Sequence, residues 1–299
     1  MRITLMAFKS LSAVLPRRRA LEAITVGLLL LAAAALAMPL LPSQPTGETA
    51  EEAAEAPQRW GRSRPRGFTD EPPEIDIENM EYNGRFTFNR VRYRPSYWSW
   101  GRYAWGLDLY WNHDYPRAEQ NLMQMLDELT LLEPNLGGGN IYEVDDPDFF
   151  KYPWAYLSEP GTWTMTDEEV DGLRNYLLKG GFLVIDDMRS QQMYVLRENL
   201  ERTLPGSRLE ILDTTHPIFH AFFDITQQDI LYQAYTYGQP VIFGVYEDND
   251  PGKRLLVVVN YNQDVGDSWE WSNAGYLPIE LSNNAYKLGI NYVVYAMTH

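Results

Sequence analysis

The stretch TDEEVDGLRNYLLKGGFLVIDD, residues 166–187, decides the fold. Thr166 and Glu169 have the T-x-x-E spacing of a capping box, which predicts that a helix begins there. Apolar side chains follow at helical spacing until Gly180 and Gly181, which favour a helix end. The run FLVI then continues without a polar residue, as is typical of a strand covered on both faces. A helix that leads into such a strand predicts an α/β sheet of parallel strands.

The region from residue 85 onward continues this alternation of helix and strand. We predict a three-layer α/β sandwich with a mostly parallel sheet and one antiparallel hairpin near an edge. Two apolar runs that flank the turn DNDPG indicate the hairpin. The predicted strands span 86–93, 141–144, 154–157, 182–185, 209–212, 241–246 and 254–261, and further helices are predicted over 116–132, 191–204 and 284–297.

The charge and composition of the chain exclude or disfavour several classes of function. The 299-residue chain has a formal net charge of −16, most of it in residues 85–299, and this charge disfavours nucleic acid as a partner. The chain has no cysteine, which excludes disulfides, thiolate metal sites, iron–sulfur clusters and a cysteine nucleophile. It also contains no H-E-x-x-H, G-x-S-x-G, P-loop or Rossmann G-x-G-x-x-G motif, so the corresponding sites are not predicted.

Residues 1–41 predict export. Three arginines at 17–19 precede the apolar run AITVGLLLLAAAALAMPLL, which is the pattern of a signal peptide or a signal anchor. Cleavage near A-L-A at 35–37 and retention in the membrane both stay open, and both carry the rest of the chain across the cytoplasmic membrane. Residues 42–84 are rich in proline and glutamate, which predicts a disordered tether to an α/β domain over 85–299. We therefore expect a periplasmic location, with membrane contact only through the N-terminal segment.

Ligands of open α/β sheets bind beyond the carboxyl ends of the strands, and an aromatic loop follows the first predicted strand. Its rings could stack on a sugar or a cation, or cover a site as a lid. The alternative interpretation is that the rings form a satellite core. The loop contains Trp98, Trp100, Trp105, Asp108, Trp111, His113 and Asp114.

A pair of carboxylates, Asp186 and Asp187, ends the predicted strand FLVI. Adjacent residues on a strand point to opposite faces, so only one of them needs to face a ligand. Such a carboxylate can bind a cation or act as an acid or base. The alternative interpretation is helix N-capping or charge compensation at the end of the strand.

The segment NYNQDVGDSWEW, residues 260–271, follows the last predicted strand and combines carboxylates with tryptophans. Its candidate ligand-binding residues are Asp264, Asp267, Trp269 and Glu270. The alternative interpretation is a solvated loop that Trp269 anchors. His216 is a further candidate, although Pro217 argues against a regular helical pair of His216 with His220.

The ordered motifs resemble a bacterial family, the domain-of-unknown-function family 4159. They are FTFNRVRY, WNHDYPRAEQNL, the opening stretch at 166–187, THPIF, NYNQDVGDSWEW and AYKLGINYVVYA, and together they cover nearly all of residues 85–299. The resemblance implies a class I glutamine amidotransferase-like, flavodoxin-like sandwich with no established activity. It also implies possible envelope partners, because some members are fused to, or encoded near, membrane proteins of the aerotolerance type with von Willebrand A domains and MoxR-type ATPases.

One departure from true amidotransferases excludes their chemistry. Those enzymes need a cysteine nucleophile after the central strand, whereas this chain has Asp186 and Asp187 there and no cysteine. We therefore expect a non-catalytic exported domain that binds a ligand or a partner protein within an envelope-associated assembly, with no cofactor and no metal assigned. The alternatives are a carboxylate- and histidine-dependent hydrolase and a glycan-binding module that uses the tryptophan loop. Convergence of Asp108, His113, Asp187, His216 and Asp264 in one place would favour the enzyme.

Overall fold

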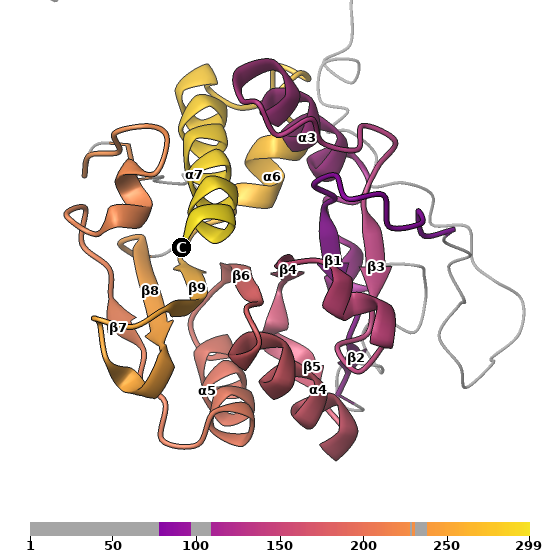
Figure 1. The fold of residues 1–299 in the computed structure, drawn as a ribbon. Helices are drawn as coiled ribbons and strands as arrows, with labels where there is room; N and C mark the ends of the chain where they lie inside the picture. Colours follow the sequence, from indigo (N-terminus) through magenta and orange to yellow (C-terminus); the bar gives the residue numbers. More distant parts are fainter. Residues whose placement is uncertain (1–77, 97–108, 228, 231–237) are drawn as a thin grey trace, which may run out of the picture. The chain divides into compact units, whose positions relative to one another are not determined.

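The structure is a computed structural model that describes residues 78–96, 109–227, 229–230 and 238–299 (Figure 1). The strands of the main sheet are β1 (Asn89–Val91), β3 (Asn140–Tyr142), β4 (Trp154–Ser158), β6 (Phe182–Met188), β7 (Glu210–Ile211), β8 (Val241–Tyr246) and β9 (Leu255–Tyr261). The principal helices are α3 (Arg117–Leu129), α4 (Asp167–Leu178), α5 (Gln192–Thr203), α6 (Val265–Glu270) and α7 (Ile279–Thr298).

The main sheet is mostly parallel and confirms the predicted α/β sandwich. Its seven strands have the order β3-β1-β4-β6-β9-β8-β7. The strands from β3 to β9 in this order pair in parallel, whereas β8 is antiparallel to both β9 and β7. The predicted hairpin is therefore present as β8 and β9. A second sheet of two short antiparallel strands, β2 (Arg94–Pro95) and β5 (Trp163–Thr164), has no counterpart in the predictions.

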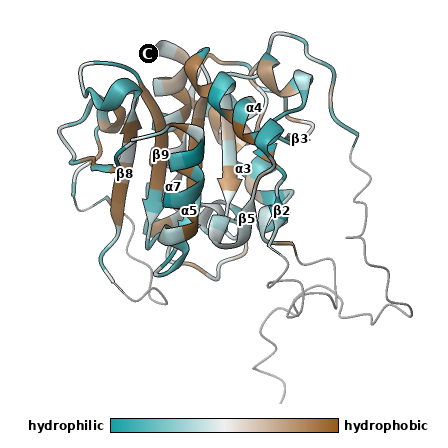
Figure 2. Ribbon diagram, turned by 90° about the horizontal axis from the view of Figure 1, so that it is seen from below, coloured by the Kyte–Doolittle hydropathy of each residue, from teal (hydrophilic) through white to brown (hydrophobic). Residues whose placement is uncertain are grey.

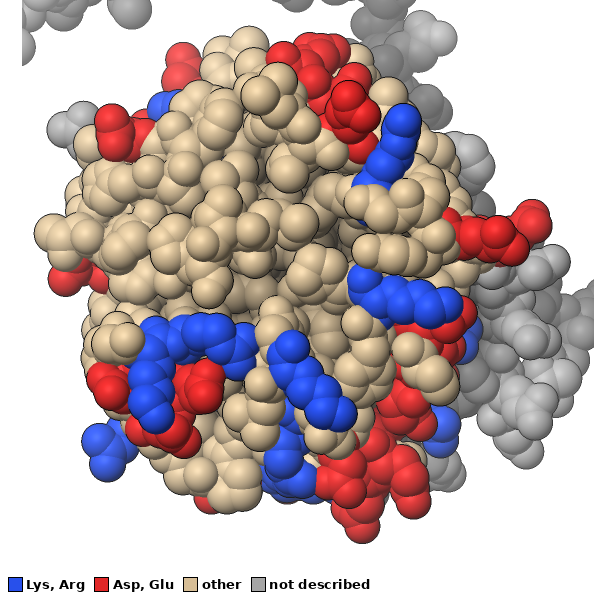
Figure 3. All heavy atoms as spheres, viewed as in Figure 1, with Lys and Arg blue, Asp and Glu red and all other residues tan. Residues whose placement is uncertain are grey.

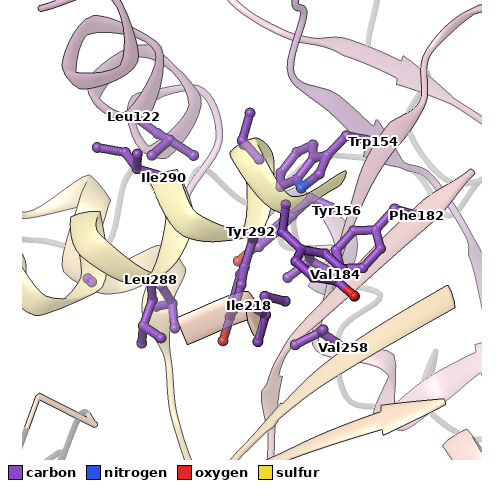
Figure 4. Packing of buried hydrophobic residues seen from close by; sticks show 14 of the residues in the cluster. Leu122, Trp154, Tyr156, Phe182, Val184, Ile218, Val258, Leu288, Ile290 and Tyr292 are labelled. Atoms are coloured by element: carbon purple, nitrogen blue, oxygen red, sulfur yellow. The ribbon is translucent and has the colours of Figure 1, made fainter. Parts of the chain in front are cut away.

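Helices cover both faces of the main sheet, as Figure 1 shows: α3, α6 and α7 lie on one side, and α4 and α5 on the other. One hydrophobic core lies on each face of the sheet, and successive residues of a strand pack in different cores. On β6, Val184 packs in the core with α3 and α7, and Ile185 packs in the core with α4 and α5. Figure 4 shows the first of these cores, in which Tyr292 of α7 lies among the strand side chains. The strands are the most hydrophobic elements (Figure 2), which is expected for a doubly covered sheet.

The capping box that opens the deciding stretch is present. The Glu169 N–H donates to the Thr166 hydroxyl at 3.2 Å, and the Thr166 N–H donates to a Glu169 carboxylate oxygen at 2.6 Å. The helix ends just before Gly180, whose φ of +117° suits glycine. Local chemistry therefore fixes both ends of α4, as predicted.

Two helices differ from the predictions. No helix is predicted in the segment at 260–271, for which a solvated loop is the alternative interpretation, but it contains α6, whose six residues are too few to give a visible helical period. The last helix was predicted over 284–297, but α7 begins at Ile279, directly after Pro278. Proline favours the start of a helix because its φ already suits a helix. It has no N–H group, but N–H groups in the first turn of a helix make no hydrogen bond within the helix anyway.

The outer edge of β3 is covered by the chain that precedes the domain. The Asn79 side chain donates to the Ile141 carbonyl at 2.8 Å and accepts from the Ile141 N–H at 2.8 Å. The Met80 N–H donates to the side-chain oxygen of Asn140 at 2.9 Å. Residues 79 and 80, which fall in the predicted tether, therefore contact the sheet. The predicted export segment at 23–41 lies outside the described residues, and within those residues no helix has the length and apolar character to span a bilayer.

Candidate functional site

The carboxyl ends of β4, β6 and β9 lie side by side, and Asp186 of β6 stands at their centre. It is fully buried and accepts four hydrogen bonds, from the Tyr156 hydroxyl (2.8 Å), the Asn260 side chain (2.9 Å), the Val265 N–H (2.9 Å) and the Gly266 N–H (2.8 Å). Burial raises the pKa of Asp186, and these hydrogen bonds oppose the rise. Asp186 thus holds the first turn of α6 against the sheet, in agreement with the N-capping alternative.

The next residue, Asp187, leaves the regular strand geometry. Its φ is +50°, and the pairing of β6 with β9 shifts register between Ile185 and Met188. Its carboxylate accepts from Arg189 Nε at 2.8 Å, and Arg189 Nη2 also lies 3.3 Å from a carboxylate oxygen of Asp264. Burial, with the negative charge of Glu159, raises the pKa of Asp187 to about 8 against the opposing effect of Arg189. Asp187 and Asp264 are therefore joined through one guanidinium group.

More carboxylates surround the start of α6. The Asp264 side chain caps the helix by accepting from the Asp267 N–H at 2.9 Å. Burial raises the pKa of Asp264 well above its usual range, and the charges of Asp187 and Asp267 add to the rise. Burial and Asp267 likewise raise the pKa of Asp114 strongly and that of Glu270 to about 7. We call Asp114, Asp187, Asp264, Asp267 and Glu270 the acidic cluster.

His113 joins this edge from the segment before α3. Its Nδ1 pairs with the Glu159 carboxylate, and its charge lowers the pKa values of Asp114 and Glu270. Arg90 of β1 contacts this segment by donating hydrogen bonds to the carbonyls of Trp111 and His113 at 2.9 Å each. Residues far apart in sequence thus meet at one edge.

This edge and the sheet below it fall within residues 87–297, which match the family model described as Domain of unknown function (DUF4159). The chain belongs to the DUF4159 family. No curated protein matches the chain. The match spans every strand of the main sheet and every member of the acidic cluster, so the site is part of the DUF4159 domain itself.

The DUF4159 domain brings most, but not all, of the predicted site residues together. His113, Asp114, Asp186, Asp187, Asp264, Asp267 and Glu270 meet at the carboxyl edge. Trp269 is fully buried in the core beside Tyr156, which agrees with its alternative interpretation as an anchor. Trp105 and Asp108 lie outside the described residues, so the glycan-binding alternative stays a prediction.

His216 lies away from this edge. Its Nδ1 accepts from the Ile218 N–H at 3.2 Å and so caps a short 3-10 helix, Pro217–His220. Its ring contacts Tyr246, the last residue of β8, and Tyr295, whose ring contacts Phe182 at the opposite end of β6 from Asp186. Burial lowers the pKa of His216. The DUF4159 domain therefore uses His216 as a cap next to α7, apart from the acidic cluster.

Sequence reasoning missed several polar residues of this edge. Glu159 and Arg189 pair with His113 and Asp187, and Ser158 and Gln263 are buried polar side chains at the ends of β4 and β9. Ser158 and Glu159 directly follow the predicted strand at 154–157. The rule that ligands bind beyond carboxyl ends would have selected them had it been applied to every strand.

Charge elsewhere on the DUF4159 domain is arranged differently. On the face shown in Figure 3, basic side chains lie beside acidic ones across the lower half. Among the described residues, Arg254 pairs with Glu247 at 3.1 Å and Arg202 with Asp167 at 3.0 Å. Ion pairs at the surface contribute little to stability. The acidic cluster differs because two of its members, Asp187 and Asp264, are buried and its carboxylates repel one another.

Proposed function

We propose that the DUF4159 domain of this chain is a non-catalytic binding domain that takes a positively charged ligand at the acidic cluster. The observation that carries the proposal is the convergence of carboxylates from three separate segments, represented by Asp114, Asp187 and Asp264, at the carboxyl edge of a parallel sheet. Ligands of open α/β sheets bind at this edge.

The electrostatics support a ligand more than a structural role. Burial and mutual repulsion raise the pKa values of Asp114, Asp187, Asp264 and Glu270, so their charged forms are unfavourable in the folded protein. Groups that are perturbed in this way cluster at functional sites. A bound positive charge would relieve the repulsion, and the relief would appear as binding free energy.

The cellular setting belongs to the same proposal. The arginines at 17–19 and the apolar run at 23–41 support export, either with cleavage or with retention as an anchor. The resemblance to exported family members supports partners among envelope proteins of the aerotolerance and von Willebrand A type. It also supports a flavodoxin-like fold of the amidotransferase-like branch for the observed sandwich.

Thermal unfolding of the purified full-length protein at pH 7.5 tests the proposal with three positively charged probes: the diamine putrescine, arginine amide and Ca²⁺. At least one should raise the midpoint in a saturable manner, because a ligand that binds only the folded state stabilises it. The uncharged diol 1,4-butanediol is the matched control for putrescine. Asp264→Asn should weaken the effect of the active probe, whereas Asp127→Asn, an exposed change on α3, should leave it unchanged. Absence of a shift with all three charged probes would overturn the proposal.

A hydrolase is the second candidate, because two groups of the cluster suit acid–base chemistry. The pKa values of about 8 for Asp187 and about 7 for Glu270 keep a proton available near neutral pH, as a general acid requires. The His113–Glu159 pair lies at the same edge. Turnover of chromogenic ester, phosphate or glycoside substrates that is lost in Asp187→Asn would replace the binding role with this one.

A further inference from the structure

Three members of the acidic cluster have the spacing of a metal site. One carboxylate oxygen each from Asp114, Asp267 and Glu270 lies within 4.8 Å of the other two. Asp267 and Glu270 are three residues apart on α6 and so share one face of the helix. All three side chains are partly exposed, so an ion from solution can reach them.

Gly266 leaves room for the Asp114 carboxylate beside α6. A Cβ atom at Gly266 would lie 2.3 Å from an Asp114 carboxylate oxygen and 2.5 Å from the Tyr156 hydroxyl. Both oxygens therefore approach the backbone of α6 at a point that only glycine leaves open. The carboxylate of Asp114 thus lies beside the two carboxylates that α6 supplies.

A buried hydroxyl group below this point is the second, independent observation. Ser158 is fully buried, and its hydroxyl has no hydrogen-bond partner among the described residues. Ser158 pairs in register with Asp186 and, by strand alternation, faces the same side of the sheet as Tyr156. It therefore faces the same side as the Tyr156 hydroxyl, which donates to Asp186 and lies with the Asp114 carboxylate beside Gly266 of α6. A buried hydroxyl without a partner is unfavourable, and a bound ion with its water ligands would satisfy it.

The donor set identifies the class of ion. All ligand atoms are carboxylate oxygens, which suit hard divalent cations. Calcium binds oxygen at about 2.3–2.6 Å, so ligands of one ion lie no more than about 5.2 Å apart. The three carboxylate oxygens, all within 4.8 Å of one another, meet this limit. We infer that Asp114, Asp267 and Glu270 bind a divalent cation of the Ca²⁺ or Mn²⁺ type, an inference that rests on the proposed function and names its ligand.

A second trio of carboxylates in the domain provides the control. One carboxylate oxygen each from Glu143, Asp145 and Glu169 also lies within 4.8 Å of the other two, and two of these residues have assigned structural contacts. Glu169 completes the capping box of α4, and Glu143 pairs with Arg92 at 3.5 Å. Asp145→Asn therefore removes a carboxylate from a comparable cluster without touching the acidic cluster.

The test is calorimetric titration of Ca²⁺ into the full-length protein after treatment with EDTA and desalting, with Mn²⁺ paramagnetic resonance as a second readout. We expect one ion per chain with a Kd of about 1 mM or tighter, the range of extracellular calcium sites. Asp267→Asn should weaken binding at least tenfold, and Glu270→Gln should do the same if the first variant does not fold. Asp145→Asn should leave the affinity unchanged.

Two results would overturn the inference: no saturable binding of either ion, or binding that Asp145→Asn abolishes and both cluster variants retain. The proposed function has a separate outcome. If putrescine or arginine amide binds while both metal ions do not, the inference fails and the proposed function stands. If none of the four probes binds, both fail.

Discussion

Replacement of Asp187 by asparagine should remove a pH dependence from the stability of the protein. Burial raises the pKa of Asp187 to about 8 in the folded state, whereas an aspartate in an unfolded chain titrates near 3.9. Between these values the folded state holds a proton that the unfolded state has released. The free energy of unfolding therefore falls as the pH rises, by about 1.4 kcal/mol per pH unit, and the fall stops above the folded pKa.

From pH 6 to pH 8 this carboxyl group should thus lower the free energy of unfolding by about 2.5 kcal/mol. Urea unfolding of the wild type and of Asp187→Asn at pH 6, 7 and 8 measures the effect as the difference between two curves, in which most other titrating groups cancel. The free energy of unfolding of the variant, relative to that of the wild type, should rise by about 2.5 kcal/mol from pH 6 to pH 8. Arg189 keeps Asp264 as a partner in the variant.

The exposed change Asp127→Asn is the control, and its curve should run parallel to that of the wild type. Parallel curves for Asp187→Asn as well would refute the reasoning, because they would mean that Asp187 carries the same charge in the folded and unfolded states over this range. The neighbours of Asp187 would then offset the effect of burial on its pKa, and Asp187 would no longer be a candidate general acid.

Gly266→Ala should lower the free energy of unfolding by about 1–3 kcal/mol, because its methyl group would overlap two side-chain oxygens; an unchanged urea midpoint would contradict that packing. Thr166→Ala should cost about 1 kcal/mol through loss of the capping box, and Thr166→Ser should not; equal midpoints for the two variants would argue against the cap. Asn79→Ala should speed hydrogen exchange at the Ile141 amide while amides of the central strands keep their rates, and a uniform change would contradict the edge contact. Alkaline phosphatase fused after residue 299 should be active if the domain is exported, and activity of a cytoplasm-only reporter in its place would contradict export.

The parts of the fold that could be predicted are those fixed by neighbours in sequence. The capping box at Thr166 and the continuous run FLVI place α4 and β6 correctly because each signal acts within one or two turns of chain. The carboxyl-end rule also selected Asp187 and Asp264 as candidates and left open whether they meet. Parallel strands bring their ends together whatever the length of chain between them.

The parts that could not be predicted depend on contacts distant in sequence. The helix α6 has only six residues, and its first N–H groups are satisfied by Asp186, about eighty residues earlier in the chain. The position of His216 beside Tyr246 and Tyr295 could not be predicted, because no local pattern indicates how the chain after β7 packs against α7. The pairing of Glu159 with His113 similarly needs the whole sheet to be in place.

The contact of Asn79 with β3 has a consequence for how the domain can associate with other chains. An edge strand normally offers its N–H and carbonyl groups as a template on which a strand of another molecule can pair. At β3 the amide side chain of Asn79 already satisfies both groups of Ile141, and the opposite edge strand, β7, is only two residues long. Within the described part of the sheet, strand addition therefore has little template at either edge, which protects these edges against edge-to-edge aggregation. A partner protein would have to recognise this domain through its side chains.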